Sequence, residues 1–100
     1  MTSYEWAIEA IDGYGDILSV DHADTYAEAA AKQRAAIAAP RDEQVDVEVC
    51  LVYNLWDDYD GDLETRQWAY VVDGVLPTLF DGGKRVPKRF IDQVAKEQKP

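Results

Sequence analysis

The chain has 100 residues, of which 47% are hydrophobic and 11% aromatic, enough for one domain with one hydrophobic core. Its 20 acidic side chains outnumber its 10 basic ones and give a formal net charge of −10. This balance argues against direct binding to nucleic acid or to an anionic membrane, because both attract positive surfaces. With one cysteine, no secretory leader pattern and no apolar run of membrane-spanning length, we expect a single cytoplasmic domain over residues 1–100.

The N-terminal segment predicts a β-hairpin. Residues 4–11 alternate between two faces and include aromatic and β-branched side chains, which is the pattern of a half-buried strand. Two glycines within residues 12–16 mark a turn. A second strand is expected over residues 17–21 and should pair with the first.

A helix is predicted over residues 26–38. Thr25 and Glu28 have the spacing of a capping box, eight alanines lie between residues 27 and 39, and Pro40 should end the helix. Small side chains dominate the face expected to be buried, so the helix can lie close against a sheet. That face consists of Tyr26, Ala29, Ala30, Gln33, Ala36 and Ile37.

Two further strands are predicted over residues 45–56 and 64–73. The Asp60-Gly61 pair between them is a two-residue hairpin signal. With those two residues as the loop, Tyr53 lies opposite Trp68, and an apolar and aromatic face is directed to the core. In the same register Asn54 lies opposite Gln67 on the other, mixed face, which is a partly covered surface or a binding surface.

The last segment predicts a short C-terminal helix. Pro87 suits its first helical position, and Phe90, Ile91 and Val94 give it an apolar side. The element order is therefore β-β-α-β-β-α. It predicts an α+β domain in which an antiparallel sheet of about four strands carries the long helix on one face.

Acidic side chains are concentrated between the third and fourth predicted strands. Five carboxylates fall within eight positions there, with no base among them. In the predicted register Asp57 and Glu64 are directly opposite, a like-charge pair that costs stability. A solvated hairpin tip also tolerates such charge, since exposed charges interact weakly, and this interpretation stays open. The candidate partner-binding residues are Trp56, Asp57, Asp58, Tyr59, Asp60, Asp62 and Glu64.

The same tip fits calcium poorly. With Gly61 at the sixth position of an EF-hand-like loop, Trp56 and Gln67 occupy the first and last ligand positions, where oxygen ligands are required. A weak cation site remains an alternative, but we predict no metal and no cofactor. Enzyme chemistry is also disfavoured: Cys50 lies in an apolar strand as a structural cysteine, and His22 is expected at the surface or just before the helix.

Residues 84–100 reverse the charge, with two acids and six bases. We expect the basic residues 84–89 to act as an intramolecular counterweight to the acidic strands. Contact with phosphate is the alternative for this segment.

Four segments of the C-terminal half resemble small phage or prophage proteins. They are Trp56-Asp57-Asp58, Asp60-Gly61-Asp62-Leu63, Gln67-Trp68-Ala69-Tyr70-Val71 and Phe80-Asp81-Gly82-Gly83. An acidic domain of this size is also similar in kind to phage anti-defence proteins, including anti-CRISPR proteins. The resemblance implies a non-enzymatic inhibitor that occupies a basic, nucleic-acid-binding surface of a host nuclease complex. Other phage or bacterial interaction, accessory, immunity and assembly roles stay open.

Overall fold

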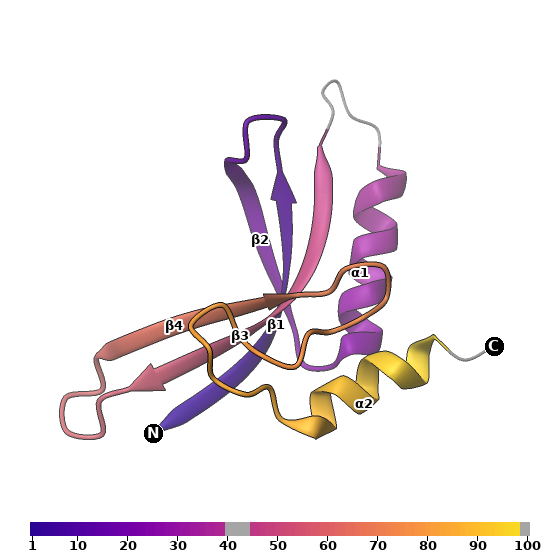
Figure 1. Ribbon diagram of the computed structural model, residues 1–100. Coiled ribbons are helices and arrows are strands. Elements are labelled where there is room, and N and C mark those ends of the chain that lie inside the picture. The colour runs from indigo at the N-terminus through magenta and orange to yellow at the C-terminus, as the bar shows by residue number, and fades with distance from the viewer. Residues whose placement is uncertain (40–44, 99–100) are drawn as a thin grey trace.

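The computed structural model describes residues 1–39 and 45–98. Four antiparallel strands form one sheet in the order β2-β1-β3-β4, and the two helices pack on the same face of it (Figure 1). This arrangement confirms the predicted α+β class and the β-β-α-β-β-α order. The elements are β1 (Thr2–Ile11), β2 (Ile17–Ala23), α1 (Tyr26–Ala38), β3 (Asp46–Trp56), β4 (Leu63–Tyr70) and α2 (Lys88–Glu97).

Helix α1 has the predicted bounds. The Thr25 hydroxyl accepts a 3.2 Å hydrogen bond from the Glu28 N–H, as an N-cap should. The Glu28 carboxylate accepts from the Asp24 N–H rather than from Thr25, so the reciprocal half of the capping box is shifted by one residue. Pro40, the predicted helix stop, lies outside the described residues.

One side of α1 is buried as predicted at Tyr26, Ala29 and Ala30. The expectation for Ile37 is wrong, since this side chain is 60% exposed. Helix α2 lies beside the N-terminal part of α1 (Figure 1), so among the described residues no helix covers the last turn of α1.

The predicted register of the second hairpin is wrong by one residue. Tyr53 pairs with Gln67, whereas Trp68 pairs with Val52. The loop is wider than Asp60-Gly61, because backbone hydrogen bonds join Asp57 N–H to the Asp62 carbonyl and the Gly61 N–H to the Asp57 carbonyl. A bulge next to Trp56 adds a further shift. A slip of one residue moves every side chain of β4 to the other face.

The core between sheet and helices is aromatic. The ring of Trp6 lies 5.2 Å from that of Tyr26 on α1 and 6.0 Å from that of Phe90 on α2. Gln93 on α2 accepts hydrogen bonds from the Trp6 indole N–H and the Tyr26 backbone N–H. One amide therefore joins α2 to both β1 and α1. Pro87 is the N-cap of α2 rather than its first helical residue.

The connection from β4 to α2 runs back along the free edge of β4. The Asp81 N–H donates to the Trp68 carbonyl, and the Asp81 carboxylate accepts from the Trp68 N–H. These bonds cover backbone groups that an edge strand otherwise exposes. In the described part of the chain, neither helix is long and apolar enough to cross a membrane.

Candidate functional site

The acidic tip of the β3–β4 hairpin lies at one end of the sheet (Figure 1). The Asp57 carboxylate does not project outward, because its Oδ1 accepts a 2.7 Å hydrogen bond from the Tyr59 N–H. Gly61 has φ +72°, a left-handed conformation that the turn requires and that glycine adopts without strain. The turn therefore holds Tyr59 outward with 94% of its surface exposed.

Four further carboxylates of the tip are exposed, namely Asp58, Asp60, Asp62 and Glu64. Asp58 forms an ion pair with the amino group of Met1. Trp56 is half-buried and donates from its indole N–H to the Ser3 hydroxyl at 3.1 Å, which ties the base of the tip to β1. The structure thus brings all seven predicted residues to one end of the sheet. The expected Asp57–Glu64 pair is absent, because Asp57 faces Asp62 instead.

The β1–β2 tip repeats this local design. The Asp12 carboxylate accepts hydrogen bonds from the Tyr14 and Asp16 N–H groups, both at 2.9 Å. Gly15 has φ +87°, and Tyr14 is 94% exposed, as Tyr59 is. An aspartate two residues before a tyrosine in a glycine-bearing turn is the sequence signal that the two tips share.

The sheet face opposite the helices carries a buried polar network that sequence reasoning missed. The Tyr70 hydroxyl donates a 2.7 Å hydrogen bond to Glu9 Oε2, and the Cys50 Sγ lies 4.0 Å from the same oxygen. Glu9 is only 3% exposed. Tyr70 lies opposite Cys50 on the neighbouring strand, so its side chain crosses over Cys50 to reach Glu9 on β1. The wrong register had placed Tyr70 on the other face.

Electrostatics keep the two donors of this network protonated. Burial, together with the nearby Glu9 carboxylate, raises the pKa of the Cys50 thiol to about 12. Burial and the hydrogen bond to Glu9 raise the pKa of Tyr70 as well. At neutral pH Cys50 is therefore a neutral thiol with no exposed surface, which is the opposite of an activated nucleophile.

His22 lies on the same face but does not meet Cys50. Both residues are opposite Ala7, one on each side of β1, so a strand separates them. His22 Nδ1 is instead 3.7 Å from Glu5 Oε2, and the other carboxylate oxygen of Glu5 lies 3.5 Å from the Arg66 guanidinium. Among residues 1–39 and 45–98, no group of three or more histidine, cysteine or carboxylate side chains is arranged to hold a metal ion.

The basic segment after Gly83 lies against aromatic rings of β1 and β3. Lys84 Nζ is 4.9 Å from the centre of the Tyr53 ring, and the Arg89 guanidinium is 5.4 Å from that of Tyr4. Within the described residues, the ion pair recorded for this segment joins Lys88 to Asp92 in the same helix. The segment therefore contacts β1 and β3 through aromatic rings, and its role as a counterweight to the acidic charge stays a prediction.

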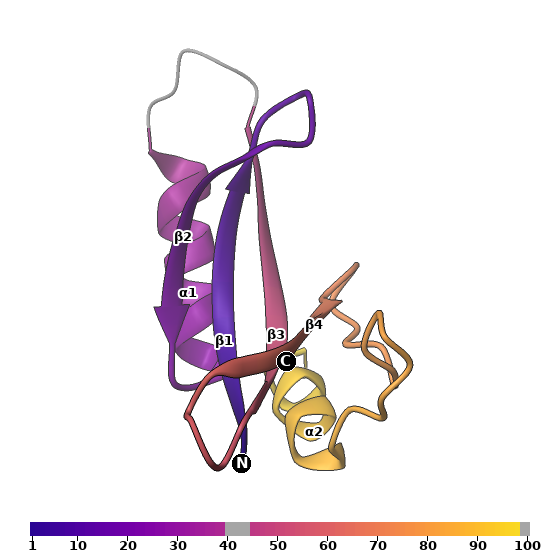
Figure 2. The same ribbon diagram turned by 90° about the vertical axis from the view of Figure 1, so that its left-hand side faces the viewer.

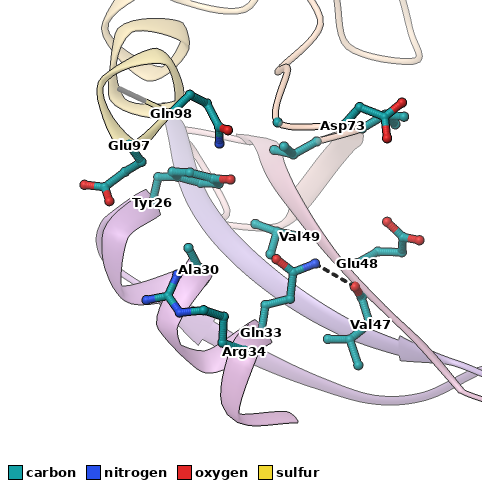
Figure 3. A pocket seen from close by; sticks show the side chains of 13 residues that line it. Tyr26, Ala30, Gln33, Arg34, Val47, Glu48, Val49, Asp73, Glu97 and Gln98 are labelled. Carbon is teal, nitrogen blue, oxygen red and sulfur yellow. Dashed lines mark hydrogen bonds between the residues drawn. The ribbon is translucent and has the colours of Figure 1, made fainter. Parts of the chain in front are cut away.

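A groove of about 470 Å³ opens between α1, β3, the turn at Asp73 and the end of α2 (Figure 3). Gln33 points into it from α1 and donates from its side-chain amide to the Val47 carbonyl at 2.8 Å. Asp73 has φ +52°, a conformation unusual for a residue other than glycine. Burial and the nearby Glu97 raise the pKa of the Tyr26 hydroxyl, which also lines the groove.

No protein-family model, curated protein or solved structure matches the chain. Its function therefore has to follow from these surfaces and their chemistry.

Proposed function

We propose that the protein is a non-enzymatic binding protein whose β3–β4 tip docks on a basic surface of another protein. The observation that carries this proposal is Tyr59, 94% exposed in a hydrogen-bonded turn and surrounded by exposed carboxylates. Tyrosine gives a large contact area at low conformational cost and is enriched among the residues that dominate binding energy. Because the turn is already ordered, less entropy is lost on docking.

Charge supports a basic partner. Alternate residues on a strand are about 6.6–6.8 Å apart and neighbouring strands about 4.8 Å, so the tip acids form a dense negative array. Duplex DNA carries one charge per about 1.7 Å of its axis. A lysine- and arginine-lined channel that binds phosphate attracts either surface.

The partner class follows from this chemistry and from the resemblance to phage anti-defence proteins. We infer that the partner is a nucleic-acid-binding subunit of a host defence nuclease complex, and that the phage-encoded protein blocks it in the cytoplasm. The alternative is another interaction or accessory role anchored by aromatic contacts. The second exposed tyrosine, Tyr14, favours that alternative, because it stands at the other hairpin tip.

The test measures association kinetics with a partner captured from bacterial lysate, over a series of salt concentrations. The tip variant combines Asp58→Asn, Asp60→Asn, Asp62→Asn and Glu64→Gln, and it keeps Asp57 because that residue holds the turn. We expect association to slow by about tenfold at low salt and its salt dependence to flatten, since steering acts mainly on the on-rate.

A matched control removes four charges elsewhere through Asp16→Asn, Asp24→Asn, Asp46→Asn and Asp92→Asn. It should slow association much less than the tip variant does. If the tip variant binds as the parent does while Trp56→Ala abolishes binding, the charge-based proposal is wrong and the aromatic alternative holds.

A further inference from the structure

Strand β3 is paired along its whole length on one side only. β1 pairs with it from Thr2–Leu55 to Ile11–Asp46. β4 pairs with it only from Cys50 to Trp56 and then turns away, as the two views show (Figure 2). The N-terminal part of β3 therefore has an edge without a neighbouring strand among the described residues.

The backbone at Val47 faces this open edge. The Val49 carbonyl accepts a 2.8 Å hydrogen bond from the Val71 N–H and so points toward the β4 side. Residues two apart on a strand direct their backbone groups the same way, which places the N–H and carbonyl of Val47 in the groove. The Gln33 amide occupies the position of a strand N–H at that carbonyl. In the described part of the chain no group accepts from the Val47 N–H.

The walls of the groove differ on its two sides (Figure 3). Glu48 and Asp73 lie on one side, whereas α1 contributes Tyr26, Ala30, Gln33 and Arg34 on the other. Three acids, Glu48, Asp73 and Glu97, contribute to the lining against one base, Arg34. A strand placed here would alternate its side chains between the acidic side and the α1 wall.

We propose that this groove binds an extended basic peptide, which adds to β3 as a strand opposite Val47. Valine-sized apolar side chains point with Val47 toward α1, and lysine or arginine side chains alternate with them to face Glu48 and Asp73. The Gln33 amide moves aside and the peptide N–H takes its place at the Val47 carbonyl. Such strand addition draws affinity from main-chain bonds and specificity from alternate side chains. The site is separate from the β3–β4 tip.

The test titrates the ¹⁵N-labelled protein with a capped hexapeptide of alternating lysine and valine, followed by NMR. Two analogues carry N-methyl groups on either the valine or the lysine amides. The proposed register is antiparallel, so the valine opposite Val47 directs its N–H to β3, because directly opposed residues of a hydrogen-bonded pair exchange both backbone bonds. Methylating the valines should weaken binding by about tenfold, from loss of the hydrogen bond to the Val47 carbonyl and from the clash of the methyl groups with β3. Methylating the lysines should leave binding nearly unchanged.

Two further arms examine charge and position. The parent protein should bind a glutamate–valine hexapeptide about tenfold more weakly than the lysine–valine peptide. The Glu48→Gln/Asp73→Asn variant should bind the lysine–valine peptide about tenfold more weakly than the parent does. The matched Asp58→Asn/Asp60→Asn variant at the tip should bind the lysine peptide as the parent does. With the lysine–valine peptide bound, the parent should show chemical-shift changes centred on Val47. Hydrogen exchange of the Val47 N–H should become slower. Equal binding of the two methylated analogues, or shifts centred on the tip or on β2, would overturn the proposal. None of these results counts against docking by the tip, which the Asp58→Asn/Asp60→Asn variant reports separately.

Discussion

The hydroxyl of Tyr70 on β4 bonds the carboxylate of Glu9 on β1 at 2.7 Å, across the intervening strand β3. The side chain that spans this distance covers Cys50 and helps to close the sheet face opposite α1 and α2. Together with Trp68, Tyr70 packs on a small apolar cluster of Ala7, Cys50 and Val52. A buried carboxylate is costly unless it is hydrogen-bonded, so this contact should be important for stability.

Replacing Tyr70 with phenylalanine should lower the free energy of unfolding by about 1.5–3 kcal/mol, because Glu9 loses a donor and stays buried. Urea unfolding at pH 7 measures the change. Tyr59→Phe is the matched control and should be neutral, since Tyr59 is 94% exposed. The double variant Glu9→Gln/Tyr70→Phe should lose less free energy of unfolding than the two single variants lose in sum. Strict additivity would contradict the coupling.

Stability should fall as the pH rises from about 9 to about 12. The folded pKa of Cys50 is raised from 9.0 to about 12, so over this range the unfolded chain has lost a proton that the native protein keeps. The unfolded state binds fewer protons, and the free energy of unfolding therefore decreases with pH. Tyr70 shifts in the same direction. Denaturant unfolding at several pH values measures the slope, which Cys50→Ala should make shallower. An unchanged slope in that variant would rule out the contribution of the thiol.

Cys50 should also resist alkylation by iodoacetamide in the native protein at pH 8, because the thiol is buried and protonated. In denaturant it should react at the rate of a free cysteine. Mass spectrometry after timed quenching distinguishes the two states. Rapid native labelling would show that the Tyr70 cover opens easily.

The register of the second hairpin can be checked with engineered disulfides in a Cys50→Ala background. Asn54→Cys with Arg66→Cys joins residues that pair directly, at a Cα separation of about 4.5 Å expected for a non-hydrogen-bonded pair, within disulfide range. Asn54→Cys with Gln67→Cys is the control, because those residues pair only in the register predicted from the Asp60-Gly61 loop. Oxidation should link the first pair, as measured by mass spectrometry. Preferential linking of the second pair would restore the simpler hairpin.

Packing of α1 is tested by Ala29→Glu, which places a charge at a position with no exposed surface. Thermal unfolding should show a loss of about 1–3 kcal/mol. Ala31→Glu lies on the exposed side of the same helix and should change stability little. Similar losses in the two variants would contradict the orientation of α1.

Local signals in the sequence determined the elements of this fold. The bounds of α1 follow from a Thr25 cap and a run of alanines, which act within one helical turn of their position. The tip acids were also visible in sequence, because their spacing along the chain is itself the feature. The different roles of these acids could not be read from the sequence. Whether Asp57 faces solvent or holds Tyr59 depends on the path of the turn.

Tertiary structure decided everything that depends on pairing between distant strands. A wider hydrogen-bonded loop over residues 57–62 competes with the two-residue Asp60-Gly61 turn, and the outcome shifts β4 by one residue. Since side chains alternate with period two, that shift alone places Tyr70 beside Glu9 instead of in the core. The groove at Val47 arises in the same way, where β4 leaves β3. No short-range pattern encodes these partners, because the residues that make each contact are far apart in the chain and meet only when the whole sheet has formed.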